Sequence, residues 1–283
     1  MSQPYITIKT IIEQNSIFFI GRIAGIELLT AYDVLNNNMM DLPEDLRQLQ
    51  DNAGIYIKDR DSLKVYVDKL IKSYKECTAI AKWPTVGDVY KETGQGQNLI
   101  LNIYPDISRI NARELEPYYF SEQESWVPKM EGKRILIIHP FIETIRKQVL
   151  NLDKIFPNRN WFKNCSFIFL KPPVTYAKNH GQVSWQESYN HFIEQLNKID
   201  GDTYDIALVA CGGYGMLVSE HIYKECKKSV IYIGGALQLF FGIIGKRWFT
   251  NKEIMALVND DWIRPVKEDR PPNYQMIEKG CYW

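Results

Sequence analysis

The sequence predicts an α/β protein with a Rossmann-like, mostly parallel sheet flanked by helices. In its second half, short apolar runs alternate with segments of helical periodicity. Those runs are apolar throughout, as expected for strands that are buried on both faces of a parallel sheet. Of the 283 residues, 45% are hydrophobic, so a sizeable core can be buried. Neither a linker nor an internal repeat interrupts the chain, and we expect a single domain over residues 1–283.

The first half predicts fewer regular elements. Apolar and β-branched residues before a glycine predict a strand, and apolar residues at helical spacing predict the helices. Asp61 or Ser62 is expected to cap the second helix, which is strongly amphipathic. The expected elements are a strand at 16–21, helices at 25–38 and 60–83, and irregular segments at 83–98 and 116–133.

The second half predicts a regular series. Prolines end one apolar run, and polar residues at helical spacing separate the others. The expected strands are 134–141, 165–173, 205–211 and 229–235, and the expected helices are 143–156, 185–199 and 216–228.

Composition excludes several classes of protein. Lys+Arg and Asp+Glu are equal at 34 each, which argues against a protein that wraps nucleic acid through its phosphates. The five cysteines are far apart and form no zinc motif, a pattern that suits a reducing compartment. The first residues lack the pattern of a signal peptide, and the longest apolar stretches are too short to span a bilayer. We therefore expect a cytoplasmic protein without a membrane span.

Glycines follow two successive predicted strands. In such sheets ligands bind beyond the carboxyl ends of the strands, and a helix N-terminus attracts phosphate. Glycine has no Cβ to hold a diphosphate away, so the pattern predicts a nucleotide-diphosphate site; close backbone packing is the alternative explanation. Neither GxGxxG nor a P-loop is present. The predicted site consists of Gly212, Gly213, Tyr214, Gly215, Gly234 and Gly235, with Lys246 and Arg247 nearby and Gln238 beside the base or ribose.

Several motifs resemble a known family. FFIGRIAGIELL (18–29) resembles the N-terminal motif of GT-D-type glycosyltransferases, in which a strand leads into Arg-Phe-Gly-Asp-Gly-Glu and a helix. Residues 207–238 resemble the later strand–helix–strand nucleotide segment of that family. The last two thirds of the chain also look like proteins of bacterial and viral surface-polysaccharide synthesis. The shared pieces are GKRILIIHPF, GGYG, IGGALQLFFGIIGKRW, WIRP and EKGCYW.

The resemblance implies a GT-D-like transferase that moves a sugar from a UDP- or GDP-sugar to a hydroxyl of a glycan acceptor. In the family motif an Asp and a Glu hold Mg²⁺ or Mn²⁺ against the diphosphate. Arg22 and Glu27 match the motif, but Gly25 stands at the Asp position. Glu27 would then bind the metal with another carboxylate, or cations such as Arg22, Lys246 or Arg247 would neutralise the diphosphate directly.

Two residues are candidates for proton transfer. Glu27 is a general base or a metal ligand, and a surface carboxylate is the alternative. His139, at the end of a predicted strand, would contact phosphate or transfer a proton, and a hydrogen-bonded structural histidine is equally consistent. A non-catalytic nucleotide- or glycan-binding subunit of a polysaccharide assembly system is the second interpretation. The stretch LQLFFGIIG is core or the interface of a homo-oligomer, and we favour core.

Overall fold

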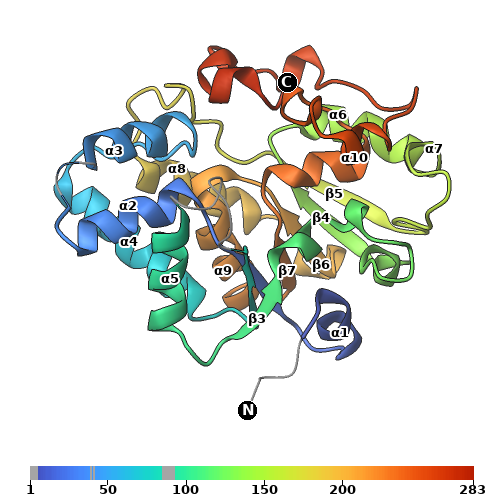
Figure 1. Ribbon diagram of the computed structural model, residues 1–283, viewed down its shortest axis with the longest axis horizontal. Coiled ribbons are helices and arrows are strands. Elements are labelled where there is room, and N and C mark those ends of the chain that lie inside the picture. Colours follow the sequence, from blue (N-terminus) through green and yellow to red (C-terminus); the bar gives the residue numbers. More distant parts are fainter. Residues whose placement is uncertain (1–5, 39, 41, 85–92) are drawn as a thin grey trace.

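The computed structural model describes residues 6–38, 40, 42–84 and 93–283. Within them, seven parallel strands form one sheet in the order β3-β2-β1-β7-β6-β4-β5 (Figure 1). The predicted α/β, Rossmann-like class is confirmed. The strands are β1 (Phe19–Arg22), β2 (Ala79–Lys82), β3 (Ser108–Asn111), β4 (Arg134–Ile138), β5 (Ser166–Leu170), β6 (Ile206–Val209) and β7 (Ser229–Tyr232).

Helices cover both faces of the sheet, and this arrangement explains the apolar strands. In β4, Ile135 and Ile137 enter one core, whereas Leu136 and Ile138 enter the other. The first core includes residues of α1, α6, α7 and α10, and the second includes residues of α2, α3, α4, α5, α8 and α9. The helices are α1 (Ile8–Glu13), α2 (Ile26–Leu35), α3 (Leu42–Asp51), α4 (Arg60–Tyr74), α5 (Thr93–Ile103), α6 (Ile142–Gln148), α7 (Leu152–Ile155), α8 (Trp185–Leu196), α9 (Gly215–Lys224) and α10 (Lys252–Met255).

The predicted strands and helices of the second half are present, but one helix of the first half is wrong at its end. The helix expected at 60–83 stops at Tyr74, and residues 79–82 form β2. Alanine is common in helices, so the run AIAK resembled their continuation. Its side chains from Ala79 to Ala81 are instead buried in the sheet. The helix cap is Asp59, which accepts a hydrogen bond from the Ser62 amide at 2.7 Å.

Other differences concern short elements. Residues 93–98, expected to be irregular, begin α5, and residues 85–92 of that expectation lie outside the described residues. Helix α3 and strand β3 were not predicted. Segment 116–133 is irregular as expected, with short 3₁₀ turns at Pro117–Tyr119 and Val127–Met130.

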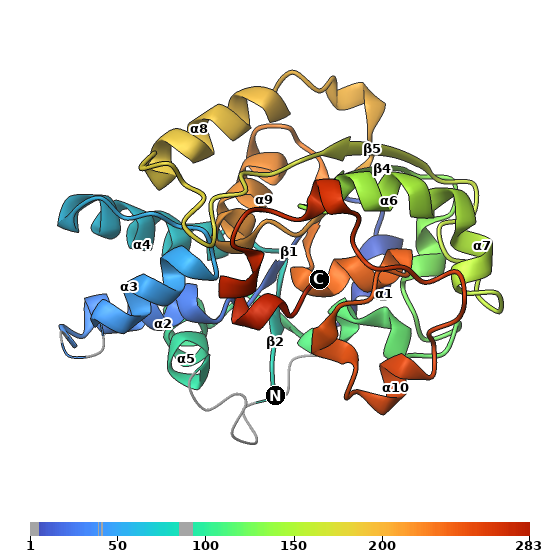
Figure 2. The same cartoon turned by 90° about the horizontal axis from the view of Figure 1, so that it is seen from above.

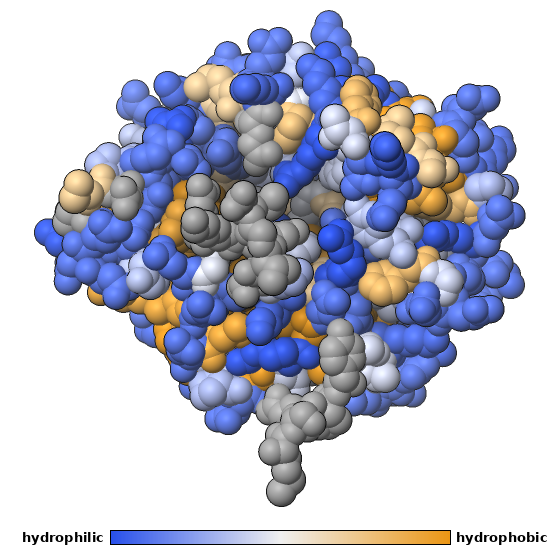
Figure 3. Space-filling model, viewed as in Figure 1, coloured by the Kyte–Doolittle hydropathy of each residue, from blue (hydrophilic) through white to orange (hydrophobic). Residues whose placement is uncertain are grey.

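The stretch LQLFFGIIG is core. Leu237, Leu239, Phe240, Phe241 and Ile243 are fully buried beneath the sheet, so this stretch offers no surface to a second copy. Figure 3 shows hydrophilic residues over most of the face seen in Figure 1, with hydrophobic residues in smaller groups between them. In the described part of the chain, no helix has the length and apolar character needed to cross a membrane.

The topology opens a crevice at the centre of the sheet. From β1 the chain moves outward to β2 and β3, whereas β7 is reached from β6 on the other side. β1 and β7 pair in parallel, through residues about 211 positions apart. Adjacent strands whose connections run in opposite directions leave room for a ligand beyond their carboxyl ends. The last segment of the chain lies between α3 on one side and α6 and α10 on the other (Figures 1 and 2).

Candidate functional site

A cleft of about 460 Å³ lies over this crevice, and we call it the main cleft. Residues that follow β1, β2, β3, β6 and β7 contribute to its walls, so it occupies the carboxyl edge of the sheet. Its polar and aromatic lining comprises Arg22, Glu27, Gln48, Asn52, Trp83, Arg113, Glu116, Tyr232, Arg247, Trp248 and Tyr282, and its glycines are Gly25, Gly212, Gly234 and Gly235.

The charged lining favours an anion. Three of the lining residues are arginines and two are glutamates. Glu116 is already paired with Arg113, with 2.6 Å between the carboxylate Oε2 and the guanidinium Nη1. Ion pairs between described residues do not include Arg22. The cleft therefore combines a positive field with low-dielectric walls, an arrangement that concentrates anionic ligands.

Arg22 is held at the end of β1 by aromatic rings and a glycine. Its guanidinium carbon lies 5.8 Å from the Trp83 ring centroid and 5.9 Å from that of Tyr232. Gly234 has φ +78°, and a Cβ there would lie 3.2 Å from the Arg22 guanidinium. Glycine at 234 is thus required both by the backbone conformation and by the arginine that lies against it.

Glu27 lies in the first turn of α2, at the wall of the main cleft. Its side chain is 7% exposed. Burial raises the pKa of the Glu27 carboxyl, while its own backbone amide and the Arg22 charge act in the opposite direction. Gly25 precedes this helix without a side-chain cap, so the N-terminal end of α2 faces the cleft with its partial positive charge. A carboxylate with a raised pKa beside cationic groups is suited to accept a proton.

A second, smaller cavity of about 110 Å³ adjoins the main cleft, and we call it the side cavity. It lies beyond the ends of β4 and β6 and contains His139 and Gln238. Both cavities are lined by Asn52, Gly212, Gly235 and Tyr282.

His139 is a neutral hydrogen-bond donor in this cavity. Its Nδ1 accepts a hydrogen bond of 2.8 Å from the Phe141 amide, so the neutral ring carries its proton on Nε2. The side chain is 2% exposed, and burial lowers the pKa of His139 to about 3. A ring that stays uncharged and already carries its proton on Nε2 does not serve as a base near neutral pH. The geometry favours the structural reading of His139 over proton transfer.

This burial predicts an acid-sensitive fold. The pKa of His139 rises from about 3 in the folded protein to about 6.5 in the unfolded chain. The unfolded state therefore binds more protons between these pH values, and protonation of His139 lowers the free energy of unfolding by about 3 kcal/mol between pH 7 and pH 4.

In His139→Asn, the side-chain oxygen replaces Nδ1 as acceptor. Its melting temperature, measured from pH 7 to pH 4, should fall less steeply than that of the wild type. His191→Asn, at an exposed position, should keep the wild-type slope, and an unchanged slope in His139→Asn would refute the assignment.

The sequence predicted the diphosphate at the GGYG turn, but most of this turn lies outside both cavities. Gly213, Tyr214 and Gly215 line neither cavity; among these four residues only Gly212 does. The Gly213 amide donates to the Ala53 carbonyl at 2.9 Å, because the chain after α3 lies against the turn. A Cβ on Gly213 would lie 2.4 Å from Ile55, and one on Gly215 would lie 2.1 Å from the Tyr232 ring. Close packing, the alternative explanation, accounts for these glycines.

The other predicted residues divide between the two cavities. Arg22, Gly25, Glu27, Gly234, Gly235 and Arg247 line the main cleft, and His139 and Gln238 line the side cavity. Gln238, expected beside the base or ribose, thus lines the side cavity and not the main cleft, where the arginines lie. Lys246 is exposed and lines neither cavity, whereas its neighbour Arg247 faces the main cleft and donates to the Tyr282 hydroxyl at 2.6 Å.

The donor set does not match the metal site that the resemblance implies. Gly25 supplies no ligand at the motif Asp position, and of the two lining carboxylates Glu116 is engaged by Arg113. Among the described residues, no group of three or more His, Cys, Asp or Glu side chains is placed to hold a metal ion. Arginines are the groups that this cleft offers to a diphosphate.

Sequence reasoning missed several lining residues. Trp83 follows β2, the strand that was read as helix, and Arg113 and Glu116 follow the unpredicted β3. Asn52 follows the unpredicted α3. The C-terminal tail packs on the body: Trp283 is buried, while Tyr282 forms a wall of both cavities.

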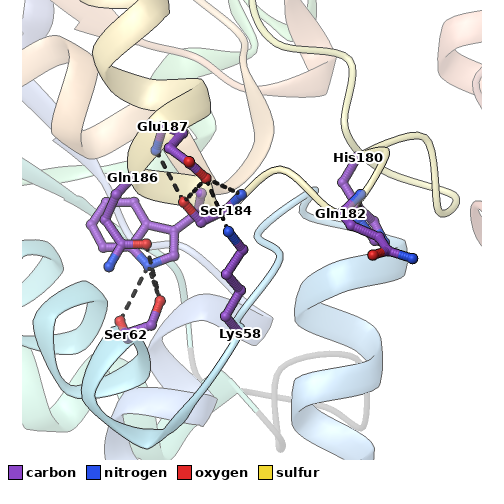
Figure 4. A network of polar contacts seen from close by, with 8 residues as sticks. Lys58, Ser62, His180, Gln182, Ser184, Gln186 and Glu187 are labelled. Carbon is purple, nitrogen blue, oxygen red and sulfur yellow. Dashed lines mark hydrogen bonds and ion pairs between the residues drawn. The ribbon is translucent and has the colours of Figure 1, made fainter.

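A network of polar contacts joins the segment before α4 to the segment that leads into α8 (Figure 4). Ser184 and Glu187 form a capping box at the start of α8, and Lys58 binds Glu187 at 3.2 Å. Ser62 donates to Gln186 at 3.0 Å, and the Thr175 hydroxyl donates to the Gly54 carbonyl at 2.6 Å. Chain segments 54–62 and 175–187 are thereby fixed together; the first follows Ala53 of the main cleft, and the second includes Tyr176 of the side cavity.

Comparison of the chain with protein-family models, with curated proteins and with solved structures finds no match.

Proposed function

We propose that this protein is a glycosyltransferase that binds a nucleotide-sugar donor in the main cleft and transfers the sugar to a hydroxyl of a glycan acceptor. The observation that carries the proposal is the position of Arg22 and buried Glu27 together in a cationic cleft at the β1/β7 switch point. A diphosphate needs cations, and transfer to a hydroxyl needs a base. Glycan synthesis in the cytoplasm is the setting we propose, in accord with five free thiols.

The donor diphosphate would lie across the N-terminal end of α2, near Arg22 and Arg247. Charge-assisted hydrogen bonds from guanidinium groups are short and strong, and they neutralise a leaving diphosphate without a metal. Ile26, Gly235 and Ala236 line the same cleft, and their backbone amides form no hydrogen bond with other described residues. They are available as further donors to phosphate oxygens.

Glu27 would act as the base. The acceptor oxygen attacks the anomeric carbon, the bond from that carbon to the diphosphate oxygen breaks, and Glu27 takes the hydroxyl proton. The diphosphate leaves with the electron pair of the broken bond. Its developing negative charge is met by Arg22, whose charge also opposes the rise that burial causes in the pKa of Glu27.

A second candidate is a non-catalytic nucleotide- or glycan-binding subunit of a polysaccharide assembly system. Gly25 in place of the motif Asp favours it, because the catalytic metal of the resembled family has no second ligand there. Release of nucleoside diphosphate from a nucleotide sugar, with acceptor glycans present, separates the two: a transferase releases it, and a binding subunit does not.

The first test is a thermal-shift panel of UDP, GDP, their sugar conjugates, ATP and NAD, each with and without Mn²⁺. A ligand that binds only the folded state raises the melting temperature with ln(1 + [L]/Kd). Stabilisation by UDP or GDP that does not require Mn²⁺ would support diphosphate binding by arginines. If none of these compounds shifts the melting temperature, the proposal fails.

Arg22→Met should weaken binding of the stabilising nucleotide about ten- to a hundredfold, since bonds to a charged group contribute about 1.5–3 kcal/mol each. Methionine keeps the length and apolar contacts of the side chain but removes its charge. Arg60→Met, at an exposed position before the body of α4, is the matched control and should bind as the wild type does. Equal titrations for Arg22→Met and wild type would exclude Arg22 from the site.

A further inference from the structure

The side cavity carries features that diphosphate binding does not use. Gln238 is 1% exposed, and its side-chain Nε2 donates to the Ile243 carbonyl at 2.9 Å and to the Tyr282 carbonyl at 3.4 Å. These two carbonyls fix the orientation of the amide, because only its NH₂ group donates. The Oε1 atom is left buried without a hydrogen-bond partner among the described residues. An acceptor left unpaired in a native fold calls for an explanation, and a bound ligand supplies one.

A donor stands in the same cavity. His139 uses Nδ1 for the Phe141 amide, and its protonated Nε2 donates to no other described residue. Two almost wholly buried residues therefore line the cavity, one with an unpaired acceptor and the other with a donor. A hydroxyl group is the ligand function that satisfies either of them.

The other residues that line the side cavity favour an uncharged ligand with a ring. Phe141, Tyr176, Tyr282 and Trp283 supply aromatic surface, and none of the described residues that line the cavity is an acid, a lysine or an arginine. Phe141 and Trp283 meet edge to face, with ring centroids 5.3 Å apart. The volume of about 110 Å³ is smaller than the roughly 150 Å³ of a cavity that holds benzene, so a sugar ring would lie only partly in the side cavity and would extend toward the main cleft, with which it shares lining residues.

We propose that the side cavity binds a single uncharged, hydroxyl-bearing sugar ring between His139 and Gln238. The inference rests on the proposed function, because a sugar placed there lies next to the main cleft across Asn52 and Tyr282. Such a ring has two sources, the sugar of the donor or the terminal sugar of the acceptor. Pockets of this kind combine apolar walls with a few placed polar groups.

The test compares three kinds of probe by ligand-observed NMR titration. They are UDP and GDP, then UDP-glucose and GDP-mannose, then the methyl glycosides of glucose, galactose, mannose and N-acetylglucosamine. His139→Asn keeps the acceptor for the Phe141 amide but removes the Nε2 donor. Gln238→Leu removes the unpaired acceptor, and its melting temperature shows whether it remains folded. His191→Asn, on the exposed face of α8, is the control.

Each variant should lose about tenfold in affinity for sugar-bearing probes and keep its affinity for the nucleotides. Loss for nucleotide sugars alone identifies the donor sugar, and loss for methyl glycosides alone identifies the acceptor sugar. Equal binding of every probe by wild type and both variants would overturn the proposal, as would a wild type that binds no methyl glycoside and binds neither nucleotide sugar better than its bare nucleotide. If nucleotides fail to bind while a glycoside binds and the variants weaken it, the proposed function fails and the sugar site stands.

Discussion

Replacing Glu27 with glutamine should lower the rate of sugar transfer about a hundred- to ten-thousandfold, the usual range for loss of a general base. Glutamine has the same shape but accepts no proton near neutral pH. Nucleotide binding should persist, because Arg22 and Arg247 remain. The change should also preserve or raise the melting temperature near pH 7. Burial raises the pKa of Glu27, so its ionised form opposes folding above the pKa of the unfolded carboxyl, and glutamine removes that cost.

Release of nucleoside diphosphate in a single turnover measures the rate, and the pH profile identifies the cause. The wild-type rate should rise with pH through a carboxyl pKa above its usual range, and Glu27→Gln should lack that rise. Glu194→Gln, on an exposed helical position, should behave as the wild type. Full activity of Glu27→Gln would remove Glu27 from the chemistry.

Replacing Gly215 with alanine should destabilise the fold by about 3 kcal/mol or more. A Cβ at this position would lie 2.1 Å from two carbons of the Tyr232 ring and 2.6 Å from its hydroxyl. Tyr232 is 2% exposed and donates to the Gly212 carbonyl at 2.9 Å, so the ring has little room to move without losing that bond. We expect a fall in melting temperature of about 6 °C or more.

Gly94→Ala is the matched control for this change. Gly94 lies in α5, and a Cβ there meets nothing within 4 Å. Alanine should therefore leave stability unchanged or raise it by up to about 1 kcal/mol. If Gly215→Ala unfolded like the wild type and lost nucleotide binding instead, the glycine would serve a ligand and not the packing of Tyr232.

The sequence predicted the positions of strands well where turn residues bound an apolar run, and less well where a strand follows a helix closely. Strands β4, β6 and β7 are apolar runs bounded by turns, and they were predicted near their true positions. β2 follows the amphipathic α4 after only a short turn, so its alanines were read as more helix. Misread β2 and unpredicted β3 and α3 each precede cleft residues, so Trp83, Arg113 and Asn52 were missed with them.

The site was predictable in part, for a physical reason. Residues at strand ends, such as Arg22 and Gly234, lie at the carboxyl edge whatever the order of the strands. Gly213 packs against Ala53 and Ile55, and Gly215 packs against the Tyr232 ring, and no local pattern reveals these long-range contacts. A glycine needed for a ligand and one needed for a neighbouring ring look the same in a sequence.

The pairing of β1 with β7 also has a consequence for how the molecule folds. The strands β1 to β3 and β4 to β7 can each begin to associate from nearer parts of the chain, but the seam between them closes a loop of about 211 residues. Closures of this length are slow, because entropy is lost before distant contacts form. The main cleft spans this seam. A molecule arrested with two separate half-sheets would hold Arg22 on one and Gly234 on the other, and would have no cleft at all.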